Sequence, residues 1–173
     1  MAGELSWDHL LEEIPAAGLT VERTADQEEG QRIAAALDLV ACLSLRARYQ
    51  ITPLTLGRYR LAGTLQAVVE QTCVVTLEPV RSEIEETYAA TYWPPQAMPA
   101  PAAGQVDLDG EPEAEPIAAG AIDAGRIVFE SLAAAIDPFP RVPGAIFEGP
   151  LSSPAGDKRE SPFAVLASLK DKT

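Results

Sequence analysis

The residue types that most often carry chemistry are few in this chain. It has two cysteines, Cys42 and Cys73, and one histidine, His9, and the three lie far apart in the sequence. A closed zinc site takes four Cys or His ligands, usually as local pairs, and nucleophilic catalysis needs a base beside its nucleophile. Because neither pattern occurs, we expect no metal and no cofactor. We expect a solvated His9, and cysteines that behave as small strand residues.

Carboxylates are plentiful, but their setting argues against catalysis. Glu83, Glu85 and Glu86 lie in a strand-like run, and further acids follow between residues 107 and 123. General acid–base chemistry needs two convergent carboxyls in unequal environments, whereas these acids occupy exposed or irregular contexts. Glycine-rich phosphate-binding patterns are absent. The sequence therefore predicts no catalytic residue and a protein that is not an enzyme.

Four arginines form the most suggestive cluster. Arg46, Arg48, Arg58 and Arg60 lie on the polar sides of two alternating segments, which would pair as an antiparallel hairpin about Pro53. In that register Arg46 lies opposite Arg60, and Arg48 lies opposite Arg58. Like charges directly opposite each other are destabilising, so counter-ions are expected. These are either phosphates of RNA or the carboxylates of Glu70, Glu83 and Glu85. A slip in register would separate the cluster.

Alternating apolar and polar residues predict the strands that hold these arginines. The alternation covers residues 40–51 and 56–77, and it resumes more weakly over 82–93. The second run is longer than an ordinary strand, so we expect a bend at Gly57 or Gly63. In the third run Trp93 faces away from the three positions Ile84, Tyr88 and Tyr92.

Two helices are expected to pack on this sheet. The first covers about residues 25–38, with Thr24 as its N-cap and Gln27 completing a capping box. The second covers about residues 123–136 and is capped by Asp123. The expected fold class is α+β: an antiparallel, strongly twisted sheet, which could close towards a barrel, packed with two main helices.

The length of 173 residues suits a single domain, residues 1–173, with two looser segments inside it. Proline, alanine, glycine and acids dominate residues 94–118, and such a composition buries too little apolar surface to offset ordering. We therefore expect a flexible acidic segment there. Residues 151–173 are expected to form a loose tail with a short amphipathic helix at 161–170.

The formal net charge of −13 bears on partners and location. An acidic protein repels phosphate at long range and attracts basic proteins, so any RNA contact would need a local positive patch. No Lys or Arg occurs between Arg81 and Arg126, and this acidic interval could receive a basic protein. No run approaches the ~20 apolar residues of a membrane span, and no secretory signal is evident. We expect a cytoplasmic protein with free thiols.

Several motifs follow one another in a specific order along the chain: the helix after Thr24, the run Cys73-Val74-Val75-Thr76-Leu77-Glu78-Pro79-Val80, the helix from Asp123 with Glu130, and the exit Asp137-Pro138-Phe139-Pro140-Arg141. In these motifs, and in their order, the chain resembles the YceD family. The residues that carry the resemblance are Cys73, Thr76, Glu78, Pro79, Asp123, Glu130, Pro140 and Arg141. The ending at residues 161–170 is similar to the usual family C-terminus. Many members carry Cys-x-x-Cys where this chain has Cys73 and Thr76, and a hydroxyl does not hold zinc as a thiolate does.

The resemblance implies a role in the accumulation of large-subunit ribosomal RNA, in a bacterial or plastid setting. Three hypotheses follow. The protein could be a non-enzymatic assembly factor that contacts pre-ribosomal large-subunit RNA through the arginine face. It could be an acidic module that chaperones a basic ribosomal protein. It could be a hydrolase or nuclease that uses carboxylates with a divalent ion. The sequence identifies no small-molecule substrate.

Overall fold

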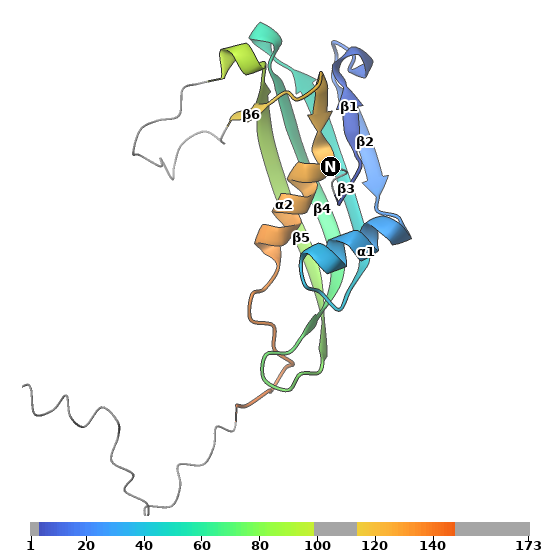
Figure 1. The fold of residues 1–173 in the computed structure, drawn as a ribbon, viewed down its shortest axis with the longest axis vertical. Helices are drawn as coiled ribbons and strands as arrows, with labels where there is room; N and C mark the ends of the chain where they lie inside the picture. The colour runs from blue at the N-terminus through green and yellow to red at the C-terminus, as the bar shows by residue number, and fades with distance from the viewer. Residues whose placement is uncertain (1–3, 99–113, 148–173) are drawn as a thin grey trace, which may run out of the picture. The chain divides into compact units, whose positions relative to one another are not determined.

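A five-stranded sheet organises the part of the chain described by the computed structural model, residues 4–98 and 114–147 (Figure 1). The strands lie in the order β2-β3-β4-β5-β6, and all neighbours are antiparallel except β5 and β6. Their bounds are β2 (Leu19–Thr24), β3 (Ala41–Pro53), β4 (Tyr59–Thr72), β5 (Pro79–Trp93) and β6 (Ala114–Pro116). The sheet is open, with β2 and β6 as its edges, so the expected closure towards a barrel is wrong.

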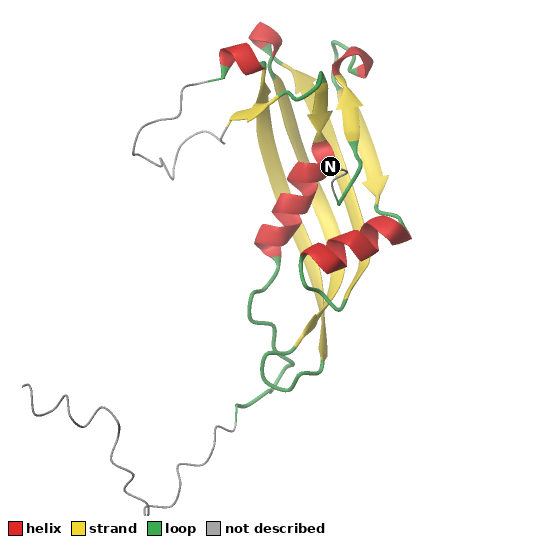
Figure 2. Cartoon of the chain, viewed as in Figure 1, coloured by secondary structure: helices red, strands yellow, loops and turns green. Residues whose placement is uncertain are grey.

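Both helices lie on the same face of this sheet (Figures 1 and 2). α1 (Gln27–Ala36) packs on β3, and α2 (Ala124–Ala135) packs on β5 and β4. A two-stranded ribbon of β1 (Asp8–Leu10) and β7 (Ala121–Asp123) lies on that side as well. Short 3-10 turns occur at Leu11–Glu13, Thr55–Gly57 and Pro95–Ala97. The α+β class with two main helices is confirmed.

The hydrophobic core fills the space between the sheet and these covering elements. Its fully buried members alternate along the strands and repeat at helical spacing on α1 and α2, as amphipathic elements require. They include Ile33, Leu45, Ile51, Leu61, Leu65, Val69, Ile122, Val128 and Leu132. Burying one such aliphatic side chain stabilises the fold by about 1.5–3 kcal/mol. Burial of the apolar side chains therefore determines which side of each strand faces the core.

The first helix begins later than the sequence predicts. Its N-cap is Asp26, whose carboxylate accepts the N–H of Glu29 at 2.8 Å, while the Glu29 carboxylate accepts the N–H of Asp26 at 3.0 Å. Thr24 cannot act as the cap because it is the last residue of β2, paired with Arg46 of β3. The second helix is capped by Asp123, as predicted.

The long alternating run at residues 56–77 begins and ends in turns, with β4 between them. Gly57 lies in the β3–β4 turn with φ of +68°, before β4 begins, so the bend expected there within the strand does not occur. Gly63 instead remains inside β4, where a Cβ atom would lie 2.4 Å from the carbonyl oxygen of Arg48 and 2.6 Å from Cβ of Tyr49. Glycine therefore permits the close approach of β3 and β4 at that point.

Part of the segment predicted to be flexible, residues 94–118, belongs to the folded structure. Residues 114–116 form β6, and Ile117 is buried and donates its N–H to the carbonyl oxygen of Trp93 at 2.9 Å. Residues 99–113, and the tail predicted for 151–173, lie outside the described residues. A second unit begins at Gly144, of which residues 144–147 are described. No helix in the described ranges is long and apolar enough to cross a membrane.

Candidate functional site

The face of the sheet opposite the helices is uncovered in the described part of the chain (Figure 1). Strand alternation sends one set of side chains into the core and the other set onto this open face. Hydroxyl and amide groups are common on the open face: Thr20, Thr24, Ser44, Gln50, Thr52, Thr64, Gln66, Thr87 and Thr91. Its charged residues are Glu22, Arg46, Arg48, Arg60, Glu70, Arg81, Glu83 and Glu85.

The open face is nearly balanced in charge, because its four arginines are matched by four glutamates. The whole chain, by contrast, has a formal charge of −13. The excess of acidic groups therefore lies elsewhere on the molecule. Repulsion of a phosphate backbone is therefore weaker at this face than the net charge of the chain alone would indicate.

The predicted arginine pairs do not form. Arg46 lies opposite Gln66, Arg48 lies opposite Thr64, and Arg60 lies opposite Thr52. The hairpin turns about Leu56, which adopts a left-handed φ of +63°, and not about Pro53. The partner of Arg46 is residue 66 instead of residue 60, a displacement of 66 − 60 = 6 positions. An even displacement keeps each side chain on its face, so Arg46, Arg48 and Arg60 still share the open face.

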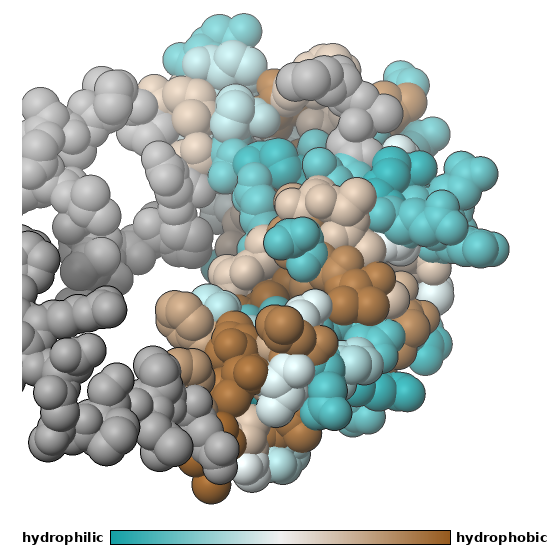
Figure 3. Space-filling view, turned by 60° about the horizontal axis from the view of Figure 1, so that its bottom comes forward, coloured by the Kyte–Doolittle hydropathy of each residue, from teal (hydrophilic) through white to brown (hydrophobic). Residues whose placement is uncertain are grey.

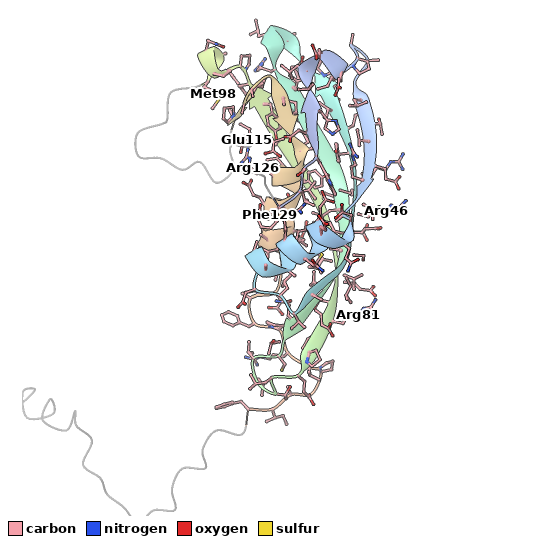
Figure 4. All side chains as sticks on the ribbon, turned by 45° about the vertical axis from the view of Figure 1, so that its right-hand side comes forward. Arg46, Arg81, Met98, Glu115, Arg126 and Phe129 are labelled. Carbon is pink, nitrogen blue, oxygen red and sulfur yellow. The ribbon has the colours of Figure 1, made fainter. Side chains whose placement is uncertain are left out.

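Arg46 and Arg48 lie beside a carboxylate that the sequence did not single out. Glu22 of β2 is directly opposite Arg48, and it forms an ion pair with the guanidinium of Arg46. The two side chains are 62% and 45% exposed, so the pair contributes roughly 0–1 kcal/mol. Figure 4 shows Arg46 projecting away from the helices. Both guanidinium groups therefore remain accessible to a partner.

The carboxylates that were expected as counter-ions lie further away on the sheet. Glu83 is opposite Val68, Glu85 is opposite Gln66, and Glu70 is opposite Arg81. None of the three forms an ion pair among the described residues. Glu22 could have been found from the sequence only if β2 had been paired with β3, a long-range pairing that periodicity does not specify.

Arg58 lies in a different environment from the other arginines. It follows the 3-10 turn, where its Nε donates to the carbonyl oxygen of Thr55 at 3.2 Å. Its guanidinium carbon is 4.7 Å from the ring centroid of Trp93, a cation–π arrangement. Arg60 follows on the open face of β4, with Thr91 of β5 opposite it. The structure thus divides the four predicted arginines into two pairs, at different places on one face.

Six of the residues that resemble the family lie around the β4–β5 loop. Cys73 is fully buried, and its sulfur accepts the N–H groups of Val75, Thr76 and Val142 at 3.3–3.4 Å. Burial raises the pKa of the Cys73 thiol, but the hydrogen bonds from Thr76, Val142 and Val75 outweigh burial and lower that pKa below its usual value. The sulfur therefore holds the loop to the segment that follows α2.

The rest of this loop is closed by backbone hydrogen bonds. The carbonyl oxygen of Glu78 accepts the N–H of Cys73 at 2.8 Å, and Pro79 then begins β5. The carbonyl oxygen of buried Pro140 accepts the N–H of Val74 at 2.9 Å, and Arg141 beside it is exposed. These family residues hold the end of the sheet together, and the contacts they make in the described structure are internal ones.

The other two family residues belong to α2. Asp123 caps the helix by accepting the N–H of Arg126 at 2.8 Å. Glu130 accepts from the Arg126 guanidinium at 2.9 Å, and Glu115 of β6 binds the same guanidinium. Figure 4 shows Arg126 and Glu115 facing each other across α2 and the sheet edge. This cluster joins α2 to β6, the strand that closes the sheet on that side.

His9 is not a solvated residue, which corrects the expectation from its polar sequence context. It is 6% exposed, and its Nε2 lies 2.8 Å from the hydroxyl of Tyr49. Burial, followed by the nearby charge of Arg23, lowers the pKa of His9. Its neighbours in sequence, Trp7 and Ile14, are buried too, because the β1–β7 ribbon covers the sheet. His9 therefore serves the core as a hydrogen-bonding residue.

Two other surfaces have some of the features of a site. A groove of about 700 Å³ lies between α1 and the start of β3, with Gly30, Ala34 and Val40 among its lining residues. Asp26, the one titratable carboxyl on it, is engaged as the N-cap. Apolar side chains also gather at the end of the molecule drawn in Figure 3, where Val40, Leu43, Val74, Leu77 and Phe139 are exposed. Neither surface has the convergent polar groups of a catalytic pocket.

The described residues also contain no group of three or more His, Cys, Asp and Glu side chains that could hold a metal ion. Cys73 is enclosed by its loop, and Cys42 lies half-buried on β3, paired with Val69 of β4. Cys42 is thus a strand residue, as the sequence predicts, whereas Cys73 lies in the loop after β4, so the prediction of a strand position is wrong for Cys73.

Comparison with known proteins gives one positive result. The family model described as "Large ribosomal RNA subunit accumulation protein YceD" matches residues 61–170. No curated protein and no solved structure matches the chain. The matched range begins in β4 and includes the Cys73 loop, β5, α2 and the segment after α2, which together form the internal contacts described above. This chain therefore belongs to the YceD family.

Proposed function

We propose that this protein is a non-enzymatic factor in ribosome biogenesis that supports the accumulation of large-subunit ribosomal RNA by contacting pre-ribosomal RNA through the open face of its sheet. The family description supports the process. The exposed, charge-balanced face with Arg46, Arg48 and Arg60 supports the mode of contact. The observation that carries the proposal is that the helices cover one face of the sheet and leave this one accessible.

The arginines on this face suit the phosphate groups of RNA. Arginine presents a planar fork of donors that matches phosphate oxygens. Arg46 shares its carboxylate partner Glu22 with Arg48, which lies directly opposite Glu22. Two guanidinium groups beside one exposed carboxylate leave a surplus of positive charge at the β2–β3 side of the face. The neighbouring threonines and glutamines add uncharged donors that can bind phosphate or ribose.

The acidic side of the same face supports a second candidate function. Glu83 and Glu85 of β5 are exposed and form no ion pair among the described residues. They would receive a basic ribosomal protein, which this chain would then chaperone. The rest of the acidic interval, residues 99–113, lies outside the described residues.

The two candidates are separated by matched double variants. Arg46→Gln with Arg48→Gln removes the basic side, and Glu83→Gln with Glu85→Gln removes the acidic side. Arg32→Gln with Arg141→Gln, two exposed arginines away from the open face, is the control for net charge. If the proposal is right, the first variant has a weaker RNA affinity, and its salt slope falls by roughly 0.7–0.9 for each phosphate that is no longer bound. It also fails to restore large-subunit RNA in cells that lack the protein.

Full restoration by a folded Arg46→Gln, Arg48→Gln variant would contradict RNA binding through this face. Failure of the Glu83→Gln, Glu85→Gln variant alone would favour the basic-protein candidate. Equal losses in the Arg46→Gln, Arg48→Gln variant and in the Arg32→Gln, Arg141→Gln control would show a general effect of net charge, which also contradicts the proposal. Cleavage of RNA by the purified protein with a divalent ion would contradict the non-enzymatic part.

A further inference from the structure

A guanidinium stacks on an indole at the end of the open face that lies next to the β3–β4 turn. Arg58 lies 4.7 Å from the Trp93 ring centroid. Thr55 holds the guanidinium in place, since its carbonyl oxygen accepts from Nε at 3.2 Å and its hydroxyl contacts NH2 at 3.4 Å. Both Arg58 and Trp93 are partly exposed. The stack is therefore formed before any ligand arrives and remains reachable from solvent.

The indole is supported from the sheet as well. Trp93 is the last residue of β5 and lies opposite Pro116 of the edge strand β6. Its carbonyl oxygen accepts the N–H of Ile117 at 2.9 Å. Strand alternation places the Trp93 side chain on the open face, away from buried Tyr92. The backbone that carries the indole is thus fixed by its pairing with the edge strand.

A second arginine lies beside the stack. Arg60 is two residues along β4 from Arg58, and two residues along a strand share one face about 7 Å apart. Arg60 is exposed, and the side chains opposite it are hydroxyls, Thr52 and Thr91. No carboxylate is paired with Arg58 or Arg60 among the described residues. A flat stacking surface therefore lies next to an unneutralised cation.

This combination matches the two chemical parts of an unpaired nucleotide. Proteins recognise single-stranded RNA by stacking its bases on aromatic rings or on guanidinium planes, and by binding its phosphates with basic residues. A paired base inside a duplex has no free face to offer. The stack of Arg58 on Trp93 supplies a flat surface on which the base can lie, and Arg60 supplies a positive charge that can bind the phosphate.

We propose that Trp93, Arg58 and Arg60 form a subsite for one unpaired base and its adjacent phosphate. The inference rests on the proposed RNA binding by the open face, and it deepens that proposal by naming single-stranded RNA as the ligand class. Arg46 and Arg48, at the other place on the face, then bind phosphates of the same strand.

The two tryptophans make the subsite directly observable. Trp7 is buried and donates Nε1–H to Glu29 at 3.0 Å, so a change in indole fluorescence on RNA binding reports on Trp93. The probes are a short oligouridylate, an abasic ribose-phosphate strand of the same length, and an RNA duplex. We expect quenching by the oligouridylate, and no quenching by the abasic strand or the duplex.

The variants separate stacking from charge. Trp93→Phe should remove the quenching. Arg58→Lys keeps the charge but removes the plane, so the affinity for oligouridylate should fall about tenfold while the salt slope stays unchanged. Arg60→Gln should lower the salt slope by about 0.7, the value for one phosphate of a single strand. Arg32→Gln, an exposed arginine away from the open face, is the matched control and should change neither quantity.

Equal binding of the abasic strand or the duplex would overturn the subsite, and so would an Arg58→Lys variant with unchanged affinity. These results leave the proposed function standing if the Arg46→Gln, Arg48→Gln variant still fails to bind RNA. Absence of every RNA signal in the wild-type protein would instead overturn both. Melting temperatures show whether the Trp93→Phe and Arg58→Lys variants are folded. If Trp93→Phe does not fold, the affinity of Arg58→Lys for oligouridylate tests the subsite by itself.

Discussion

Cys73 holds its loop together through hydrogen bonds to its sulfur. Its sulfur is fully buried and accepts three backbone N–H groups, two from its own loop and one from Val142. The family position that often holds a second cysteine is Thr76 here. The Thr76 hydroxyl accepts the N–H of Glu78 at 3.4 Å. In this chain the loop is therefore held by hydrogen bonds to one sulfur and one hydroxyl.

Replacing Cys73 should destabilise the protein, and the loss should depend on whether the new side chain can still accept hydrogen bonds. Cys73→Val removes the acceptor and leaves buried N–H groups unsatisfied, which costs about 1–3 kcal/mol of unfolding free energy. Cys73→Ser keeps an oxygen that can accept, so its loss should be smaller. Urea unfolding measures both. Cys42→Val, at a half-buried strand position, is the control and should change little. A Cys73→Val protein as stable as the wild type would refute this account of the loop.

At the scale of elements, α1 is connected to the N-terminal segment by one buried carboxylate. Glu29 accepts the N–H of Asp26 at 3.0 Å, the indole N–H of Trp7 at 3.0 Å and the N–H of Ser6 at 3.3 Å. The capping box thus does more than begin a helix, because it also fixes residues 6–7 against it. The sequence predicts a capping box here but places it on Thr24 and Gln27.

Glu29→Ala should therefore cost more than an ordinary helix cap. It removes the partner of two backbone donors and one buried indole donor, so we expect a loss of at least about 2 kcal/mol. Glu28→Ala, on the exposed side of the same turn, should cost less than about 0.5 kcal/mol. Thermal unfolding of the two variants, compared with the wild type, provides the measurement. Similar stabilities for both variants would contradict the role assigned to Glu29.

At the scale of the whole molecule, the described part of the fold consists of one open sheet with its covering elements on one side. The hydrophobic core is complete without a ligand, and the described residues contain no metal-binding group of side chains. The open face is not covered by other described elements, and its balanced charge differs from the −13 of the chain.

Metal removal should accordingly have no effect on the folded state. We expect prolonged treatment with a chelator to leave the melting temperature unchanged, because the Cys73 loop is closed by hydrogen bonds. Elemental analysis of the purified protein accompanies the melting curve. A large fall in melting temperature, or zinc present in a stoichiometric amount, would disprove this prediction.

Local pattern is enough to predict the elements and their faces. Alternation over 40–51 and 56–77 assigns Leu45, Ile51 and Leu61 to the core and Arg46 to the open face, as the structure has them. These assignments succeed because side-chain direction in a strand depends only on parity. The Asp123 cap is predicted for a similar reason, since capping involves neighbours within one turn.

Interactions between distant segments could not be predicted in the same way. The β3–β4 register, the ion pair of Arg46 with Glu22, the burial of His9 and the stack of Arg58 on Trp93 all join segments that periodicity treats separately. Parity survives an even change in register, which is why the face was right and the pairs were wrong.

The sequence by itself determined the family, the α+β class and the polar face that carries the arginines. Only the tertiary structure decided that the described residues leave this face uncovered, that the arginines divide into two pairs and that Arg58 of one pair contacts Trp93. The physical reason is that apolar alternation specifies which side chains must be buried, whereas turn conformation at Leu56 and the pairing of β2 with β3 specify which polar side chains meet.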